Sequence, residues 1–407
     1  MTTVTRLNHA RNDMSSVYTN DMYIAMLGRQ PAIGMAELER TFGNVRWFSH
    51  DTALVDTNEL DIEKLGGTVR AGYVVKELDR GDWHKTSTEL VRTYYEKWTK
   101  ADGKITVGFS VYGFSISPRE IQRTGLILKS RLKSKNVSLR LIPNEQAVLS
   151  TATSHHNKLG LSPNKVEILI IRGHNGKVIV AESTGSQNIT SLARRDQERP
   201  ARDAFVGMLP PKLAQIMINL AGLPDTQARI LDPFCGTGVV LQEAALLGYD
   251  SYGTDLSEKM VRYSQKNMAW LAEKFNTRTD VMIEEGDAMS TIWQQPIDAV
   301  VCETYLGQPF SAPPSPSKLA EVTRNCDHII SEFLTNIGGQ IKSGTTLCVA
   351  VPAWQNKDGG FTHLPLTRMI GDLGYRRHTF KNLRDEDLLY FRPDQVVARE
   401  LLVLEKQ

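Results

Sequence analysis

A glycine-rich segment in the second half of the chain has the residue types of a ligand-binding turn. Ile230 and Leu231 precede Asp232-Pro233-Phe234-Cys235-Gly236-Thr237-Gly238, and a helix with an apolar face over 239–247 follows. Glycine lets the backbone turn tightly and approach a ligand, and the helix N-terminus presents N–H donors. Asp255 ends the next apolar run, where an acid that holds ribose hydroxyls is expected. The pattern predicts a nucleotide-type binding corner.

A second group with chemical potential lies farther along, in Cys302-Glu303-Thr304-Tyr305-Leu306-Gly307. The apolar run before it predicts a buried strand, and ligands of α/β sheets gather at the carboxyl ends of such strands. An ionised Glu303 only accepts hydrogen bonds, so it could hold an amino group and orient its nitrogen lone pair. Tyr305 could stack on a flat base. The structural alternative is that Glu303 caps a turn and Tyr305 packs in the core.

Strands and helices alternate through residues 204–407, which predicts a doubly wound parallel sheet of Rossmann-like type, in the α/β class. Beyond the glycine turn we expect strands ending at Asp255 and over 281–284, 298–302 and 345–351, and helices over 258–275, 319–341 and 366–373. Two final apolar runs, 377–383 and 396–404, suit an antiparallel pair at one edge of the sheet.

The first half predicts two smaller α+β units behind a flexible tail, 1–20. Strands interleaved with two short helices over 21–80 suggest a ferredoxin-like domain. Over 81–184 we expect a helix from Ser87, its N-cap, to Lys100, a helix over 118–133 opened by Ser117-Pro118, and a hairpin around His174-Asn175-Gly176. The polar stretch 185–203 predicts an interdomain linker, whose arginines either touch RNA or pair with neighbouring acids.

Positive charge is concentrated in the middle of the chain. The net charge is only +2, but residues 81–200 hold 19 Lys or Arg against 10 Asp or Glu, which suggests contact with a polyanion. A run with a single acid, Glu120, predicts phosphate contacts rather than an ordinary solvated helix face. Its basic residues are Arg119, Arg123, Lys129, Arg131, Lys133, Lys135 and Arg140.

The composition, 41% hydrophobic and 23% charged, is that of a soluble globular protein. No apolar run reaches the length of a membrane span, and the N-terminus lacks the apolar stretch of a secretory signal. The four cysteines are too widely spaced for a metal site or a disulfide framework. We therefore expect a cytoplasmic protein with no metal and no membrane partner.

Several segments together resemble a known family. Asp232-Pro233-Phe234-Cys235-Gly236-Thr237-Gly238 resembles the first motif of S-adenosylmethionine-dependent methyltransferases that act on base amino groups. With further segments, the chain resembles the THUMP-containing tRNA guanosine N2-methyltransferases, the branch acting on guanosine 10. These segments are 27–31 with 36–39 (ferredoxin-like unit), 109–113 with the basic helix (THUMP domain), and 199–203 through 207–214 (entry to the Rossmann-like domain).

The resemblance implies S-adenosylmethionine as cofactor and tRNA as partner, with a small activating protein subunit as a further candidate partner. The methyl group would pass directly to an amino nitrogen of a flipped base, N2 of a guanosine. Glu303, Tyr305 and Leu306 are the expected catalytic residues. Asp255 would hold the ribose, and Asp287, after the third strand, the adenine amino group. The expected cofactor-binding residues are Met208, Pro210, Asp232, Pro233, Gly236, Gly238, Asp255, Leu256, Asp287 and Ala288.

One segment departs from the family pattern. At the fourth strand the family carries Asp-Pro-Pro-Tyr-Gly, whereas here Glu303 stands for the acid and Leu306 for the stacking aromatic. The longer Glu303 could still reach an amino group, and Tyr305 could replace the ring from one position earlier. The alternative functions are an adenine N6-methyltransferase on RNA or DNA, and an RNA-binding protein with an inactive methyltransferase domain.

Overall fold

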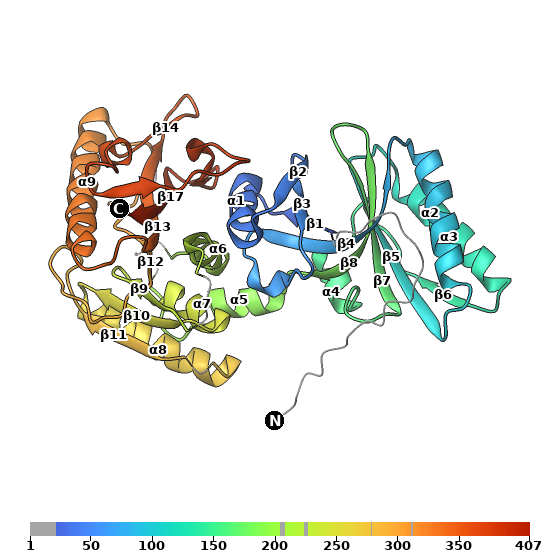
Figure 1. Ribbon diagram of the computed structural model, residues 1–407, viewed down its shortest axis with the longest axis horizontal. Coiled ribbons are helices and arrows are strands. Elements are labelled where there is room, and N and C mark those ends of the chain that lie inside the picture. The colour runs from blue at the N-terminus through green and yellow to red at the C-terminus, as the bar shows by residue number, and fades with distance from the viewer. Residues whose placement is uncertain (1–21, 204–207, 224–226, 278, 311) are drawn as a thin grey trace.

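The computed structural model describes residues 22–203, 208–223, 227–277, 279–310 and 312–407. An N-terminal part and a C-terminal domain lie along the long axis of the molecule (Figure 1). The predicted tail, 1–20, lies outside the described residues. Helix α1 (Pro31–Phe42) faces helix α6 (Pro211–Ala221) of the C-terminal domain, and helices α2 (Trp83–Trp98) and α3 (Pro118–Lys133) lie at the opposite end of the N-terminal part.

The N-terminal part is built on one sheet. Its elements are β1 (Met22–Leu27), α1, β2 (Val45–Ser49), β3 (Thr52–Asp56), η1 (Ile62–Lys64), β4 (Thr68–Leu78), α2, β5 (Lys104–Tyr112), α3, β6 (Ser138–Leu141), α4 (Thr151–His156), β7 (Lys165–Arg172) and β8 (Val178–Ser186). Within the described residues the sheet has eight strands, in the order β2-β3-β1-β4-β8-β7-β5-β6. Strands β4 and β8 pair along most of their length, so the ferredoxin-like and THUMP-like units predicted on either side of residue 80 share a continuous sheet.

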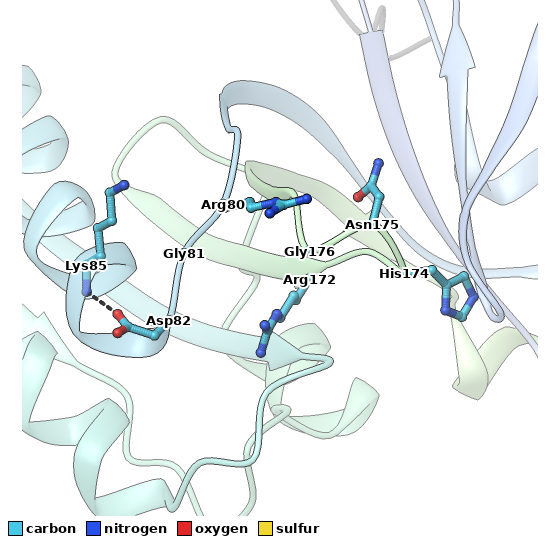
Figure 2. Close-up of a pocket in the computed structure, with 8 residues that line it drawn as sticks. All are labelled: Arg80, Gly81, Asp82, Lys85, Arg172, His174, Asn175 and Gly176. Atoms are coloured by element: carbon cyan, nitrogen blue, oxygen red, sulfur yellow. Dashed lines mark hydrogen bonds between the residues drawn. The ribbon is translucent and has the colours of Figure 1, made fainter.

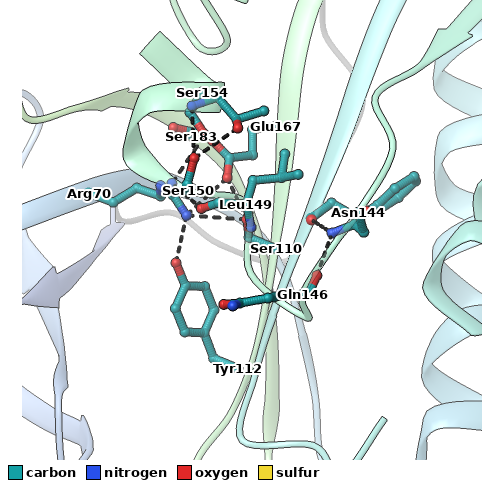
Figure 3. A network of polar contacts seen from close by, with 12 residues as sticks. Arg70, Ser110, Tyr112, Asn144, Gln146, Leu149, Ser150, Ser154, Glu167 and Ser183 are labelled. Carbon is teal, nitrogen blue, oxygen red and sulfur yellow. Dashed lines mark hydrogen bonds and ion pairs between the residues drawn. The ribbon is translucent and has the colours of Figure 1, made fainter. Parts of the chain in front are cut away.

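A buried arginine ties the two units together. Arg70 of β4 is only 3% exposed, and its guanidinium faces hydroxyls and a carboxylate from β5, α4 and β7 (Figure 3). It donates to Ser110 Oγ at 3.2 Å and to Ser154 Oγ at 3.1 Å, and lies 3.1 Å from Glu167 Oε1. Because a buried charge that loses its partners is strongly destabilising, this network fixes the first unit against the second.

Local signals predicted these elements with uneven success. Helix α3 begins and ends as predicted, and Ser117 forms a capping box with Glu120. The hairpin of β7 and β8 is also confirmed. The N-cap prediction for Ser87 is wrong, because the Asp82 carboxylate accepts a hydrogen bond from Lys85 N at 2.8 Å and starts α2 at Trp83. The predicted linker contains a helix, α5 (Ile189–Gln197).

The C-terminal domain is a second, mostly parallel sheet. Its elements are α6, β9 (Arg229–Asp232), α7 (Val239–Leu247), β10 (Asp250–Asp255), α8 (Glu258–Phe275), β11 (Val281–Glu285), β12 (Ala299–Glu303), α9 (Pro316–Gly338), β13 (Thr346–Gln355), β14 (Phe361–Thr362), η2 (Pro365–Arg368), β15 (Tyr375–Arg377), η3 (Asp385–Asp387), β16 (Leu389–Tyr390) and β17 (Val397–Lys406). The strand order is β11-β10-β9-β12-β13-β17-β15, with β9 to β13 mutually parallel and β17 antiparallel to its neighbours. The predicted doubly wound sheet is therefore confirmed, and the run 396–404 forms the antiparallel strand β17. The strand predicted over 377–383 is wrong, because the strand that pairs with β17 there is β15, which ends at Arg377.

Helices cover both faces of this sheet. Helix α9 packs the buried Cys326, Ile330 and Phe333 on one face, and α6 and α7 form a separate core on the other. The helix predicted over 366–373 is wrong. Only the short η2 turn forms there, because Gly371 and the left-handed Gly374 interrupt the run.

The N-terminal part is fixed to the C-terminal domain through α1 and α6. Glu37 of α1 is fully buried, and its carboxylate accepts from Gly66 N and Gly67 N at 2.8 Å and from Asn219 Nδ2 at 2.7 Å. Arg40 donates from Nε to the carbonyl of Leu220 at 3.1 Å, at the end of α6. Because hydrogen bonds are directional, these contacts orient the two parts rather than merely tether them.

Glu37 should make stability depend on pH. Burial raises its pKa from 4.5 to about 7, so between those values the folded state holds a proton that the unfolded state has released. Unfolding free energy therefore falls as pH rises through this window, by roughly 3 kcal/mol in total. The slope of stability against pH from 5 to 7 should be shallower in Glu37→Gln than in the wild type, measured by urea unfolding. An unchanged slope would contradict the assignment, whatever the absolute stability of the variant.

Candidate functional site

Three acidic side chains meet at the carboxyl edge of the central parallel strands. Asp232 ends β9, Asp255 ends the neighbouring β10, and Glu303 ends β12 on the other side of β9. The strand order reverses between β9 and β12, so this is the switch point at which α/β sheets open a crevice. The strand register brings the three acids to one edge, where the sequence pattern led us to expect ligands.

The glycine turn is held in place by the next strand. The Asp255 carboxylate accepts from Gly236 N through Oδ2 and from Ser257 N through Oδ1, both at 2.9 Å. Gly236 and Gly238 have φ of 52° and 80°, conformations that favour glycine. A Cβ on Gly238 would lie 2.9 Å from Ser264 Oγ, whereas one on Gly236 would meet only Phe234 O at 3.9 Å. Gly238 therefore serves packing on α8, and Gly236 leaves open space for a ligand.

The turn is lined by acidic side chains and contains no basic one. Asp232 is 2% exposed, and burial raises its pKa well above the ordinary value, as do the nearby carboxylates of Asp255 and Glu303. The Phe234 N–H donates to Asp232 Oδ1 at 3.1 Å and opposes that rise. Residues 232–238 contain no lysine or arginine. A site of this kind favours a cationic ligand over a phosphate.

The other predicted cofactor residues lie in the turn, after β10 and β11, and before α6. Asp287 follows β11 and accepts from Met289 N at 2.9 Å, with Ala288 buried beside it. Leu256, after Asp255, is 71% exposed and offers an apolar surface at the same edge. Pro233 is buried within the turn. Met208 and Pro210 precede α6 and are partly buried, with the Met208 sulfur 3.7 Å from Arg199 Nη2.

The three predicted catalytic residues differ in their surroundings. Glu303 forms an ion pair from Oε1 to Arg399 Nε, a contact that sequence reasoning missed. Its pKa is raised by burial, and Arg399 opposes the rise. Tyr305 is 41% exposed and Leu306 is partly buried, so the tyrosine presents more of its surface. The alternative that Tyr305 packs in the core is wrong. A signal for Arg399 was available, because a charged residue interrupts the apolar run of β17.

All seven basic residues that were predicted to contact RNA are exposed. Within the described residues, none of them forms an ion pair. Five lie on α3, and Lys135 and Arg140 lie beyond its end. The linker arginines behave differently. Arg195 donates to both carboxylate oxygens of buried Glu243 on α7, at 2.7 and 3.2 Å, so the acid-pairing alternative holds for it.

A basic hollow of about 480 Å³ lies elsewhere on the N-terminal part, between the start of α2 and the turn that joins β7 to β8 (Figure 2). Sequence reasoning did not identify it, because its residues come from two segments that lie far apart in the chain. Arg172 lies with its guanidinium carbon 5.6 Å from the centre of the Phe114 ring. The lining residues are Arg80, Gly81, Asp82, Lys85, Arg172, His174, Asn175 and Gly176.

Metal clusters and membrane-spanning helices are both absent from the described residues. No group of three or more His, Cys, Asp or Glu side chains in these ranges is arranged to hold a metal ion. In the same part of the chain, the helices are all too short or too polar to cross a bilayer.

Comparison with known proteins gives consistent matches. A family model for the RMKL-like methyltransferase domain matches residues 199–319. The tRNA (guanine(10)-N2)-dimethyltransferase of Methanothermobacter thermautotrophicus is 31% identical over 166 residues, which span 40% of this chain and less than half, 45%, of that protein. The Methanocaldococcus jannaschii protein of the same name is 32% identical over 288 residues, 68% of this chain and 77% of that protein. The crystal structure of TrmN from Thermus thermophilus superimposes with a TM-score of 0.51 at 15% identity, covering 95% of this chain and 100% of that one.

The sheet order, the glycine turn and these matches define the C-terminal domain as a methyltransferase domain with a Rossmann-like fold. The similarity to the Methanocaldococcus protein extends well beyond this domain. The chain belongs to the tRNA (guanine(10)-N2)-dimethyltransferase family.

Proposed function

We propose that this protein is an S-adenosylmethionine-dependent tRNA methyltransferase that acts on an exocyclic base amino group, N2 of a guanosine. The observation that carries the proposal is the position of Glu303 and the exposed Tyr305 at the switch point, one strand away from the glycine turn. Family membership supports the same reaction, because the relatives are named for methylation of guanine 10.

The glycine turn fits S-adenosylmethionine better than a phosphate-bearing nucleotide. Three carboxyl groups line the edge and the turn carries no basic residue, so a pyrophosphate would find no cationic partner in the turn, whereas the hydroxyl and ammonium groups of the cofactor would find acceptors. Asp255 has lone pairs left for ribose hydroxyls after accepting two backbone N–H groups. Leu256 would face the adenine, and Asp287 its amino group.

The bound cofactor would supply an electrophilic methyl group on sulfur. Glu303 would accept a hydrogen bond from the target amino group and so direct the nitrogen lone pair, and it would then take the proton that nitrogen loses. Tyr305 would stack on the extracted base, with Leu306 packing beside it. The contribution of the protein is positioning and electrostatics, with no covalent intermediate.

The N-terminal part would bind the tRNA body. Helix α3 and the residues that follow it carry seven exposed Lys and Arg side chains. None of them has an acidic partner among the described residues, which suits phosphate contacts. The THUMP-like role of residues 81–184, cytoplasmic location and an activating subunit remain predictions from the sequence. The basic hollow is a second candidate phosphate site in the same part, since Arg80, Lys85 and Arg172 form no ion pair within the described ranges.

The salt dependence of tRNA binding tests both basic surfaces. A triple variant of α3 that combines Lys129→Ala, Arg131→Ala and Lys133→Ala should reduce the slope of log K against log salt by about 2 if the helix meets phosphates. The double variant Arg80→Ala with Arg172→Ala should reduce the slope by about 1.5 if the hollow meets them.

A charge-matched control separates local contacts from the loss of net charge. The control for the triple variant replaces three exposed lysines of the C-terminal domain, and the control for the double variant replaces two of them. Each control should keep a slope of log K against log salt close to that of the wild type. A surface whose variant matches this control is not part of the RNA interface. The control substitutions are Lys266→Ala, Lys274→Ala and Lys342→Ala.

Nucleoside mass spectrometry tests the proposed reaction. Purified protein is incubated with unmodified tRNA and methyl-labelled S-adenosylmethionine, and the digested RNA is searched for labelled nucleosides. Labelled N2-methylguanosine is the expected result. Labelled N6-methyladenosine would replace the target with adenine. Absence of label, with cofactor and tRNA binding both measured as intact, would favour an RNA-binding protein with an inactive domain.

A further inference from the structure

Arg399 reaches Glu303 from a strand that is not the neighbour of the strand carrying Glu303. It lies on β17, and β13 separates β17 from β12. In the register of the sheet, Glu303 is opposite Ala350 of β13, and Arg399 is opposite Pro352 of the same strand. Ala350 and Pro352 have short side chains, so the arginine can pass over them. Its Nε meets Glu303 Oε1 there.

Both members of this pair are largely removed from water. The Arg399 side chain is 8% exposed and the Glu303 side chain 14%. Glu303 in turn raises the pKa of Asp232 on β9 and of the Cys302 thiol on its own strand, so these groups face one another at the strand ends. A carboxylate in such a place would tend to hold its proton, and a protonated carboxyl group is a poor acceptor for an amino N–H. An arginine is always charged, so it supports the ionised form at neutral pH.

The backbone that carries Glu303 is fixed separately. Thr304 donates to the carbonyl of Ala350 from its N–H and from its hydroxyl, both at 3.0 Å. The strand end is therefore held by β13 and the carboxylate by β17. Within the described residues, Oε1 of Glu303 meets Arg399 and Oε2 makes no hydrogen bond.

We propose that Arg399 is a positioning residue that keeps Glu303 ionised and leaves its Oε2 to accept the hydrogen bond of the substrate amino group. This inference rests on the proposed methyltransferase function for its catalytic part only. The turn 303–307 contains no proline to stiffen it. The ion pair with Arg399 would hold Glu303 in place instead, through a contact with a residue far away in the sequence.

The experiment compares full-length Arg399→Met, Arg399→Lys, Glu303→Gln and the double variant Glu303→Gln with Arg399→Met. In Arg399→Met, kcat should fall about 10²-fold with cofactor affinity unchanged, and the acid limb of the pH–kcat profile should move to higher pH. Arg399→Lys should recover part of the rate. The double variant should be no slower than Glu303→Gln alone. Arg376→Met is the control, because Arg376 forms an exposed ion pair with Glu405 at the edge of the same sheet.

Two outcomes would overturn the proposal. One is a slow Arg399→Met enzyme whose pH profile has not moved, which would indicate a structural role. The other is a double variant in which the two losses multiply, since independent residues behave in that way.

Thermal unfolding gives a readout that needs no activity. In Arg399→Met the Glu303 carboxylate has lost its partner, so adding Glu303→Gln should raise the temperature midpoint of unfolding above that of Arg399→Met alone. A double variant with no higher midpoint would refute the ion pair, even if no RNA substrate is methylated. A wild type that methylates nothing, with this recovery observed, would count against the proposed function alone.

Discussion

Replacing Glu303 with glutamine should lower kcat for methyl transfer by about 10²- to 10³-fold while leaving the affinities for cofactor and tRNA almost unchanged. The side chains have the same shape, but the amide has one acceptor oxygen and one donor NH₂ group. Arg399 would attract that oxygen, because a guanidinium only donates, and would turn the NH₂ group away from itself. An NH₂ group facing the substrate amino group would then repel it. The loss should therefore appear in the chemical step.

Single-turnover methylation of tRNA measures this step directly, and cofactor binding by calorimetry separates it from ground-state affinity. Glu332→Gln on α9 is the matched control, since this glutamate is exposed and is not part of the site. Wild-type turnover in Glu303→Gln would remove Glu303 from the reaction. An equal loss of cofactor affinity would instead make it part of the cofactor site.

The acids of this site could be predicted from the sequence because parallel strands align their carboxyl ends. Asp232, Asp255 and Glu303 each follow an apolar run, and one topological rule brings them to the same edge. The glycine turn could also be predicted from the sequence, since Gly236 and Gly238 have backbone conformations that other residues avoid. Local chemistry and strand order were sufficient for these residues.

Contacts between distant segments could not be predicted in the same way. The Arg399–Glu303 pair depends on β17 lying beside β13 and on the small side chains between, neither of which a local pattern specifies. The buried network joins Arg70 to Ser154, 84 positions away, across two predicted domains. Such partners are chosen by the register of the whole sheet. The adjacent charges Arg399 and Glu400 within the apolar part of β17 mark the position but do not identify the partner of Arg399.

The joining of the two parts has a functional consequence, because α6 contacts the N-terminal part and begins directly after Pro210, a predicted cofactor-binding residue. Gly66 lies where a Cβ would overlap the carbonyl oxygen of Lys212 and would be 2.8 Å from Ile216 Cγ1. The first of these atoms is helix backbone, which cannot move aside as a flexible side chain can. Contact this close makes the orientation of the N-terminal part depend on the packing of Gly66 and α1 against α6.

Gly66→Ala should therefore reduce tRNA methylation by about 10²-fold while cofactor affinity stays near the wild-type value. The added methyl group must push the N-terminal sheet away from α6, which destabilises the joined state by about 3 kcal/mol, and a shift of about 1 Å in a bound substrate has an effect of this size on rate. Thermal unfolding followed by calorimetry should show two separated transitions in place of one. Gly371→Ala is the control, because its Cβ would meet no atom within 4 Å and its φ is not positive. If Gly66→Ala methylates tRNA normally and unfolds in one transition, the interface tolerates the shift. The position of the target nucleotide relative to Glu303 would then have to be set by the tRNA rather than by the interface.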